Sequence, residues 1–86
     1  MKLRIPTRLR LPFGYTVKVR VVTDAQMLEA LEDDDKDNLC DGLWLVDTRE
    51  ILLLKSLTLV RKAEILGHEV DHAVNDFRHW LRDETA

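Results

Sequence analysis

A run of apolar residues at intervals of three and four dominates the last third of this 86-residue chain. Such residues fall on one side of an α-helix, because a helix turns about 100° per residue. With Ser56 or Thr58 as the N-cap, the pattern predicts one long amphipathic helix that ends near Leu81 or Arg82. The positions are Leu59, Ala63, Leu66, Val70, Ala73, Val74, Phe77 and Leu81. A helix with one apolar stripe has to cover another element, so we expect it to supply most of the core.

The segments before this helix have the pattern of β-strands. Residues 15–21 alternate apolar and polar side chains, with the two-residue period of a half-buried strand. The apolar runs 43–46 and 51–54 flank a four-residue polar connection and therefore predict a hairpin. Residues 23–26, Thr-Asp-Ala-Gln, have the form of a capping box and predict a short helix. An N-terminal arm interrupted by prolines is expected to add an extended segment or edge strand.

These elements predict an α+β fold in a single domain over residues 1–86. We expect a small antiparallel or mixed sheet of three to four strands, packed on the one long C-terminal helix. The apolar runs are far shorter than the roughly 18 residues needed to cross a bilayer, so no membrane span is expected. The start of the chain shows no apolar signal region and the single cysteine fits a reducing compartment, which together predict a cytoplasmic protein.

Charge is distributed unevenly along the chain. Residues 1–20 carry six basic and no acidic residues, whereas residues 24–50 carry ten acidic and two basic ones. The simplest interpretation is that two solvated segments of opposite charge attract one another across the fold. The basic arm lacks interleaved aromatic residues and any known binding motif, so the sequence disfavours nucleic acid as a partner.

The residues that could carry chemistry lie in the middle of the predicted helix, where His68, Glu69 and His72 form an H-E-x-x-H motif. Two histidines four residues apart share one helix face, so both imidazoles can bind one zinc ion. Glu69 lies beside them, where its carboxylate can act as a general base and acid toward water and substrate. On an ideal helix the motif faces away from the apolar stripe, which predicts a metal site open to a cleft.

Residues 65–73, Ile-Leu-Gly-His-Glu-Val-Asp-His-Ala, resemble the corresponding stretch of the zincin metallopeptidases. The chain is most similar to small gluzincin-like proteins related to the ImmA/IrrE-type peptidases, which phages and mobile elements often carry. In these proteins a strand pair also leads into the helix that carries the motif. The resemblance covers about residues 42–80, while the N-terminal third matches only in being sheet-forming.

The resemblance implies a function and a set of site residues. Zinc would be the cofactor, His68 and His72 would be its ligands, and Glu69 would be the catalytic acid and base. The substrate would be a peptide or protein. The hairpin strand at residues 51–54 would border the substrate cleft, where a peptide could bind by strand addition.

A catalytic zinc site usually has three protein ligands, and in gluzincins the third is an acid on a later helix. Only fourteen residues follow His72 here, so the third ligand has to come from elsewhere. Asp76 shares the helix face of the two histidines and is the first candidate. His79 lies about 16 Å along the axis from His68, too far to share one ion. The alternatives are a second subunit in a homo-oligomer or larger assembly, or one of four other acids, Asp47, Glu50, Asp83 and Glu84.

Two functions from different classes are compatible with these residues. The first is hydrolysis of peptide bonds by a small zinc metallopeptidase. The alternative is a non-catalytic phage structural or regulatory protein on a zincin-derived scaffold, in which the histidine pair binds metal weakly or not at all. Zinc binding by the purified protein distinguishes the two hypotheses.

Overall fold

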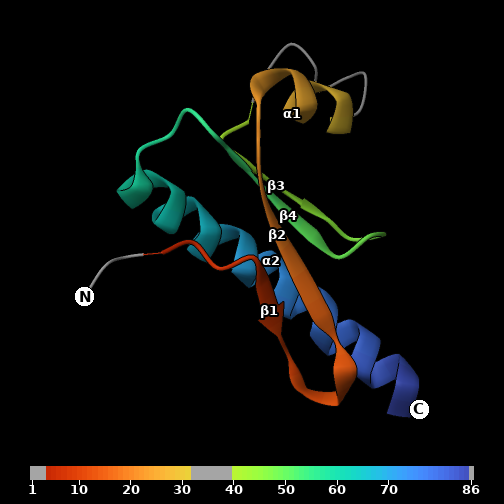
Figure 1. The fold of residues 1–86 in the computed structure, drawn as a ribbon. Coiled ribbons are helices and arrows are strands. Elements are labelled where there is room, and N and C mark those ends of the chain that lie inside the picture. Colours follow the sequence, from red (N-terminus) through yellow and green to blue (C-terminus); the bar gives the residue numbers. More distant parts are fainter. Residues whose placement is uncertain (1–3, 32–39, 86) are drawn as a thin grey trace.

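The computed structural model describes residues 4–31 and 40–85. The acidic run at residues 32–38, which the sequence predicts to be an exposed loop, lies outside these residues. In chain order the elements are β1 (Arg8–Arg10), a 3₁₀ turn (Pro12–Gly14), β2 (Thr16–Val22), α1 (Asp24–Ala30), β3 (Gly42–Leu45), β4 (Glu50–Leu54) and α2 (Leu59–Thr85). The four strands form one mixed sheet, and α2 packs across it (Figure 1). The α+β prediction is therefore confirmed.

The strand order of the sheet is β1-β2-β4-β3. The predicted hairpin is present, since β3 and β4 pair antiparallel, as do β1 and β2. In contrast, β2 and β4 are parallel neighbours, with Lys18 opposite Glu50 and Val22 opposite Leu54. Both edges of β4 are therefore paired, so the expected addition of a peptide strand at residues 51–54 is wrong. The edge strand of the hairpin is β3.

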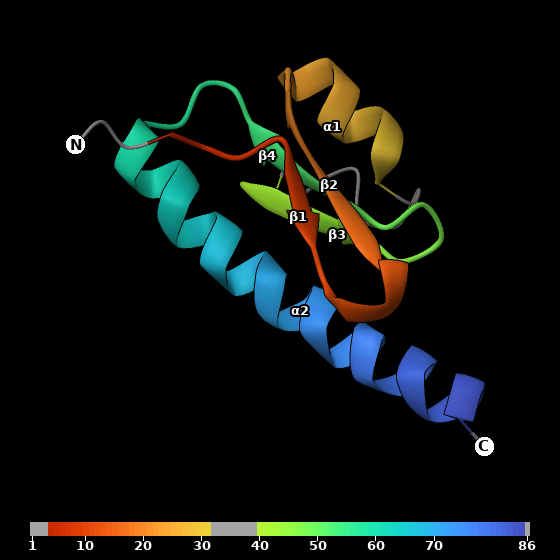
Figure 2. The same cartoon turned by 60° about the horizontal axis from the view of Figure 1, so that its bottom comes forward.

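The two faces of the sheet carry different helices. Side chains alternate between the faces, so Val17 and Val19 of β2 face α2 together with Ile51 and Leu53 of β4. On the other face, Met27 of α1 packs on a second cluster made of Val22, Leu52 and Leu54. Figure 2 shows α2 running along the sheet on one side, while α1 lies at one end of the other side.

Side-chain caps begin both helices, as the sequence predicts. At α1 the backbone N–H of Gln26 donates to Thr23 Oγ1 at 3.3 Å, and the backbone N–H of Thr23 donates to Gln26 Oε1 at 2.9 Å. At α2 the backbone N–H of Arg61 donates to Thr58 Oγ1 at 3.2 Å. Each cap satisfies backbone donors that the first helical turn leaves unpaired. Within the described residues, neither helix combines the length and the apolar composition of a membrane span.

The predicted stripe of α2 is confirmed in its middle, where Leu66, Val70, Ala73 and Phe77 pack in the core, but the face toward the sheet includes more than that stripe. Its two buried residues are Ala73 and Glu69, and Glu69 is only 8% exposed. Leu59, at one end of the predicted stripe, is 44% exposed. A prediction from hydrophobic periodicity places every glutamate on the solvent-facing side of a helix. It therefore could not place Glu69 in the contact between α2 and the sheet. The prediction that the whole motif faces away from the core is wrong for Glu69 and correct for the two exposed histidines.

Candidate metal site

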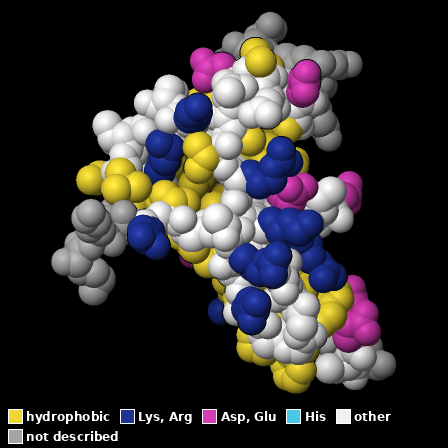
Figure 3. Space-filling view, viewed as in Figure 1, with side chains coloured by type: hydrophobic (Ala, Val, Ile, Leu, Met, Phe, Trp, Pro, Cys, Tyr) yellow, Lys and Arg dark blue, Asp and Glu magenta, His cyan; other side chains and the backbone are white. Residues whose placement is uncertain are grey.

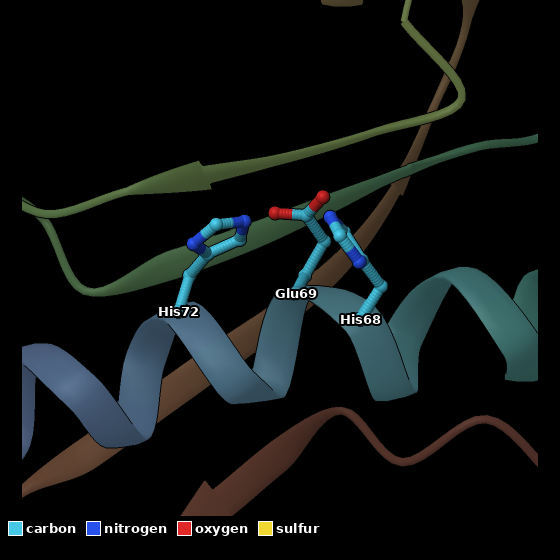
Figure 4. A group of neighbouring side chains, drawn as sticks. All are labelled: His68, Glu69 and His72. Atoms are coloured by element: carbon cyan, nitrogen blue, oxygen red, sulfur yellow. The ribbon is translucent and has the colours of Figure 1, made fainter.

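One turn in the middle of α2 brings three metal-binding side chains together. His68, Glu69 and His72 each offer one ligand atom, and these atoms all lie within 4.8 Å of one another. The imidazole centroids of the two histidines are 5.0 Å apart, with the ring planes 84° to each other. Figure 4 shows the Glu69 carboxylate between the two imidazoles, on the side of the helix that faces the strands.

This arrangement fits a zinc ion. Two imidazoles are ligands that zinc enzymes use, at bond lengths near 2.1 Å, and a neighbouring carboxylate can serve either as a further ligand or as a base toward bound water. Ligand atoms around a tetrahedral ion are then roughly 3.3 Å apart, so the observed separations need side-chain rotation but no movement of the helix. His68 and His72 are exposed and free to make that rotation. The three residues are therefore a group that could hold a metal ion.

The edge strand β3 lies directly over this group. A hollow of about 280 Å³ is lined by residues 42–44 of β3 together with Glu69 and His72. Glu69 forms the part of the site that is covered by the strand, whereas His68 and His72 remain open to solvent. The site thus has a buried carboxylate on one side and exposed metal-binding groups on the other.

Gly42 allows β3 to approach α2 this closely. A Cβ atom at Gly42 would lie 2.3 Å from Cγ2 of Ile65 and 3.3 Å from Cγ of Glu69. The first distance is far inside van der Waals contact, so any larger residue here would require Ile65 or β3 to shift. The sequence signal for this contact is a glycine at the start of an apolar strand, which often marks a close approach of two backbones but does not name the partner.

Asp76, the predicted third ligand, has a partner on β3. Its Oδ2 accepts a hydrogen bond from the indole Nε1 of Trp44, which joins α2 to the edge strand one turn beyond His72. Asp76 is not part of the group whose ligand atoms lie within 4.8 Å. Its assignment as a ligand therefore stays a prediction.

Three of the alternative ligands are placed elsewhere. Glu50 lies on the opposite face of the sheet and pairs with Arg20 at 3.2 Å. Hydrogen bonds from Thr48 and Arg20 lower the pKa of Glu50. Because α2 continues to Thr85 without a break, Asp83 and Glu84 do not fold back toward His72. These three alternatives are therefore wrong, whereas Asp47 lies exposed in the β3–β4 connection and outside the ligand group.

An aromatic cluster holds the C-terminal half of α2 against the sheet beyond Asp76. The Tyr15 ring lies 5.2 Å from Phe77 and 5.2 Å from Trp80, measured between ring centroids. The Arg49 guanidinium lies over the Tyr15 ring at 4.1 Å. Burial raises the pKa of Tyr15, Arg49 opposes that shift, and the charge of Asp76 adds to it. The phenol therefore remains neutral beside Asp76.

No known protein family matches this chain, and no curated protein or solved structure is significantly similar to it. The likeness to zincins therefore rests on the H-E-x-x-H motif and its setting. The motif lies within a regular helix, and its His-Glu-His group could bind a metal ion.

Asp76→Asn and Trp44→Phe are each expected to lower the free energy of unfolding by about 1–2 kcal/mol, because the first removes the charge of the acceptor and the second removes the donor of a half-buried hydrogen bond. Chemical denaturation of the metal-free protein measures this loss. Zinc titration of the same variants then tests Asp76 as a ligand. If Asp76 is a zinc ligand, Asp76→Asn should bind zinc at least about tenfold more weakly, whereas Trp44→Phe should bind zinc as the wild type does. Unchanged zinc affinity in Asp76→Asn would contradict it.

Proposed function

We propose that this chain is a small zinc-dependent peptidase, with zinc held by His68 and His72 and with Glu69 as the catalytic base. The observation that carries the proposal is the position of the H-E-x-x-H turn beneath the edge strand β3. Metal-binding groups, a covered carboxylate and a sheet edge that pairs with no further strand among the described residues meet at this one place. Asp76 is the proposed third protein ligand.

Glu69 and the two histidines have separate tasks in this mechanism. A bound zinc ion would polarise the substrate carbonyl and make a water molecule more acidic. Glu69 accepts the proton that this water loses as it attacks the carbonyl, and then donates it to the leaving amine. Contact with β3 limits the positions open to the Glu69 side chain, which supports its role as a fixed base. One ring nitrogen of His68 and one of His72 lie within 4.8 Å of each other, which supports their role as a ligand pair.

The free edge of β3 favours an extended peptide as the substrate. Within the described residues β3 pairs only with β4, and the backbone N–H of Leu54 donates to the Asp41 carbonyl at 3.0 Å. Backbone groups alternate in direction along an antiparallel strand, so those of Gly42 and Trp44 point to the free edge. A peptide that pairs with this edge would lie beside the hollow next to His72. The substrate class we propose is therefore an unfolded or loop segment of a protein.

Hydrolysis of a mixture of quenched fluorescent peptides by the zinc-loaded protein tests the proposal. Glu69→Gln is expected to lower the rate by a factor of about 10²–10⁴, the usual effect of losing a general base. The same variant should still bind zinc, because both imidazoles remain. Zinc content and rate are measured on the same samples, with and without a chelator.

Glu64→Gln is the matched control, because it removes the same charge from an exposed position on α2 outside the ligand group. It should retain the wild-type rate. If the wild-type protein binds no zinc at micromolar concentration, the proposed function is wrong. If it binds zinc but cleaves no peptide, the catalytic part is wrong and the non-catalytic alternative is favoured.

A further inference from the structure

The face of the sheet opposite α2 carries a row of exposed basic side chains. Cross-strand partners and alternate residues of one strand share a face, which places Arg8, Arg10, Lys18 and Arg20 together. In Figure 3, Lys and Arg side chains, coloured dark blue, gather in the region where Figure 1 places β1 and β2. We call these four residues the basic face.

Acidic side chains approach the basic face at its Arg20 end, where Glu29 of α1 and Arg20 line one hollow. Among the residues of β1, β2 and β4, the one acid is Glu50, which pairs with Arg20. Arg8 is directly opposite Lys18 across the strand pair. Like charges in such a pair destabilise a sheet, so this arrangement has a cost for folding. The helix α1 covers only the end of this face near Val22. The chain as a whole has a net charge of −3, so the positive charge here is local.

An exposed aromatic residue lies at one end of the basic face. Phe13 is 76% exposed and belongs to the turn that joins β1 to β2, three residues after Arg10. Its backbone is in the left-handed region, with φ 64°, which is rare for a bulky residue. The Phe13 ring therefore contributes little to the core, and a turn with an unfavourable backbone conformation exposes it to solvent.

We propose that the basic face binds single-stranded nucleic acid, with Phe13 stacking on a base. The cations supply charge complementarity to successive phosphates, and the ring supplies a stacking surface that only unpaired bases can use. The base-stacking ring favours a nucleic acid over an acidic protein or an anionic membrane. The sequence disfavoured this partner because no aromatic residue alternates with the cations. The pairing of β1 with β2 brings the cations of the basic face together, and the turn between these strands places Phe13 at its end.

Fluorescence anisotropy with a labelled oligo(dT) tests the proposal. With three or four phosphates contacted, the logarithm of the affinity should fall with the logarithm of salt concentration with a slope of about −2 to −3. The double variant Arg8→Gln/Lys18→Gln should bind about tenfold more weakly, with a shallower slope. The control Arg78→Gln/Arg82→Gln removes the same charge from exposed positions of α2 and should bind within twofold of wild type. An equal loss in both variants would contradict a site on the basic face.

Phe13→Ala distinguishes a nucleic acid from a polyanion of any kind. Because the ring is exposed, the variant should fold as wild type does, which circular dichroism can verify. It should bind oligo(dT) at least about fivefold more weakly and bind polyphosphate, which has no bases, unchanged. If Phe13→Ala binds oligo(dT) as tightly as wild type, the proposal is overturned. Removal of zinc with a chelator should leave the binding of oligo(dT) unchanged, because the His-Glu-His group lies on the other side of the sheet.

Discussion

His72→Ala is expected to lower the affinity for zinc by at least about a hundredfold, because it removes one of the two imidazoles that can reach a single ion. His68→Ala should have the same effect, since the two ligand positions are equivalent on the helix. Competition with a chromogenic chelator gives the affinities. A zinc ion present at a hundred times its Kd should also stabilise the wild-type fold by about 2.7 kcal/mol, a gain that thermal denaturation can detect.

His79→Ala is the control for these variants. His79 is exposed on the same helix but lies outside the ligand group, so its removal should leave zinc affinity unchanged. Comparable losses in all three histidine variants would indicate weak binding to scattered surface groups. Full retention of affinity in both His68→Ala and His72→Ala would contradict a site on this helix turn.

Gly42→Ala is expected to destabilise the protein by about 1–3 kcal/mol, the usual cost of overpacking a well-packed contact. The new methyl group would overlap Cγ2 of Ile65, so either the Ile65 side chain or β3 would have to shift. Since β3 also covers Glu69, we expect the same variant to reduce peptidase activity. Denaturant unfolding and the hydrolysis assay measure the two effects.

A glycine-to-alanine substitution at Gly67 should raise the free energy of unfolding, whereas the one at Gly42 should lower it. Gly67 is exposed within α2 and a Cβ there would meet nothing within 4 Å. Gly67→Ala should therefore stabilise the fold by about 0.5–1 kcal/mol through helix propensity alone. Ile65→Ala removes the atom that the new methyl group of Gly42→Ala would overlap. The double variant should therefore lose less stability than the sum of the losses in the two single variants. A neutral Gly42→Ala, or fully additive costs, would contradict the close crossing of β3 and α2.

Elements that depend on local patterns could be predicted from the sequence. The period of α2, the alternation in β2, the Thr23 capping box and the β3–β4 hairpin each depend on residues a few positions apart. The histidine pair belongs to the same class, because a separation of four residues on a helix already places both imidazoles together. These predictions needed no knowledge of how the elements pack.

Features that depend on distant residues could not be predicted in this way. The parallel pairing of β2 with β4 joins strands about thirty residues apart, and it decides which strand is the edge. Glu69 is buried because Gly42 lets the strand β3 approach it. A prediction from hydrophobic periodicity counts only apolar residues as buried, so it could not include this glutamate. The hydrogen bond from Trp44 to Asp76 likewise depends on the position of β3 over α2.

The placement of His68 and His72 within one turn of a 27-residue helix also bears on the order of folding. Forming the first turns is the unfavourable step of helix formation, and an ion that links residues four apart would offset part of that cost. If the proposed zinc site is correct, the ion would be captured by a nascent helix before any strand has paired, whereas the covered position of Glu69 exists only after β3 has docked. Refolding with zinc present should accordingly be faster, and zinc uptake should precede the burial of Trp44.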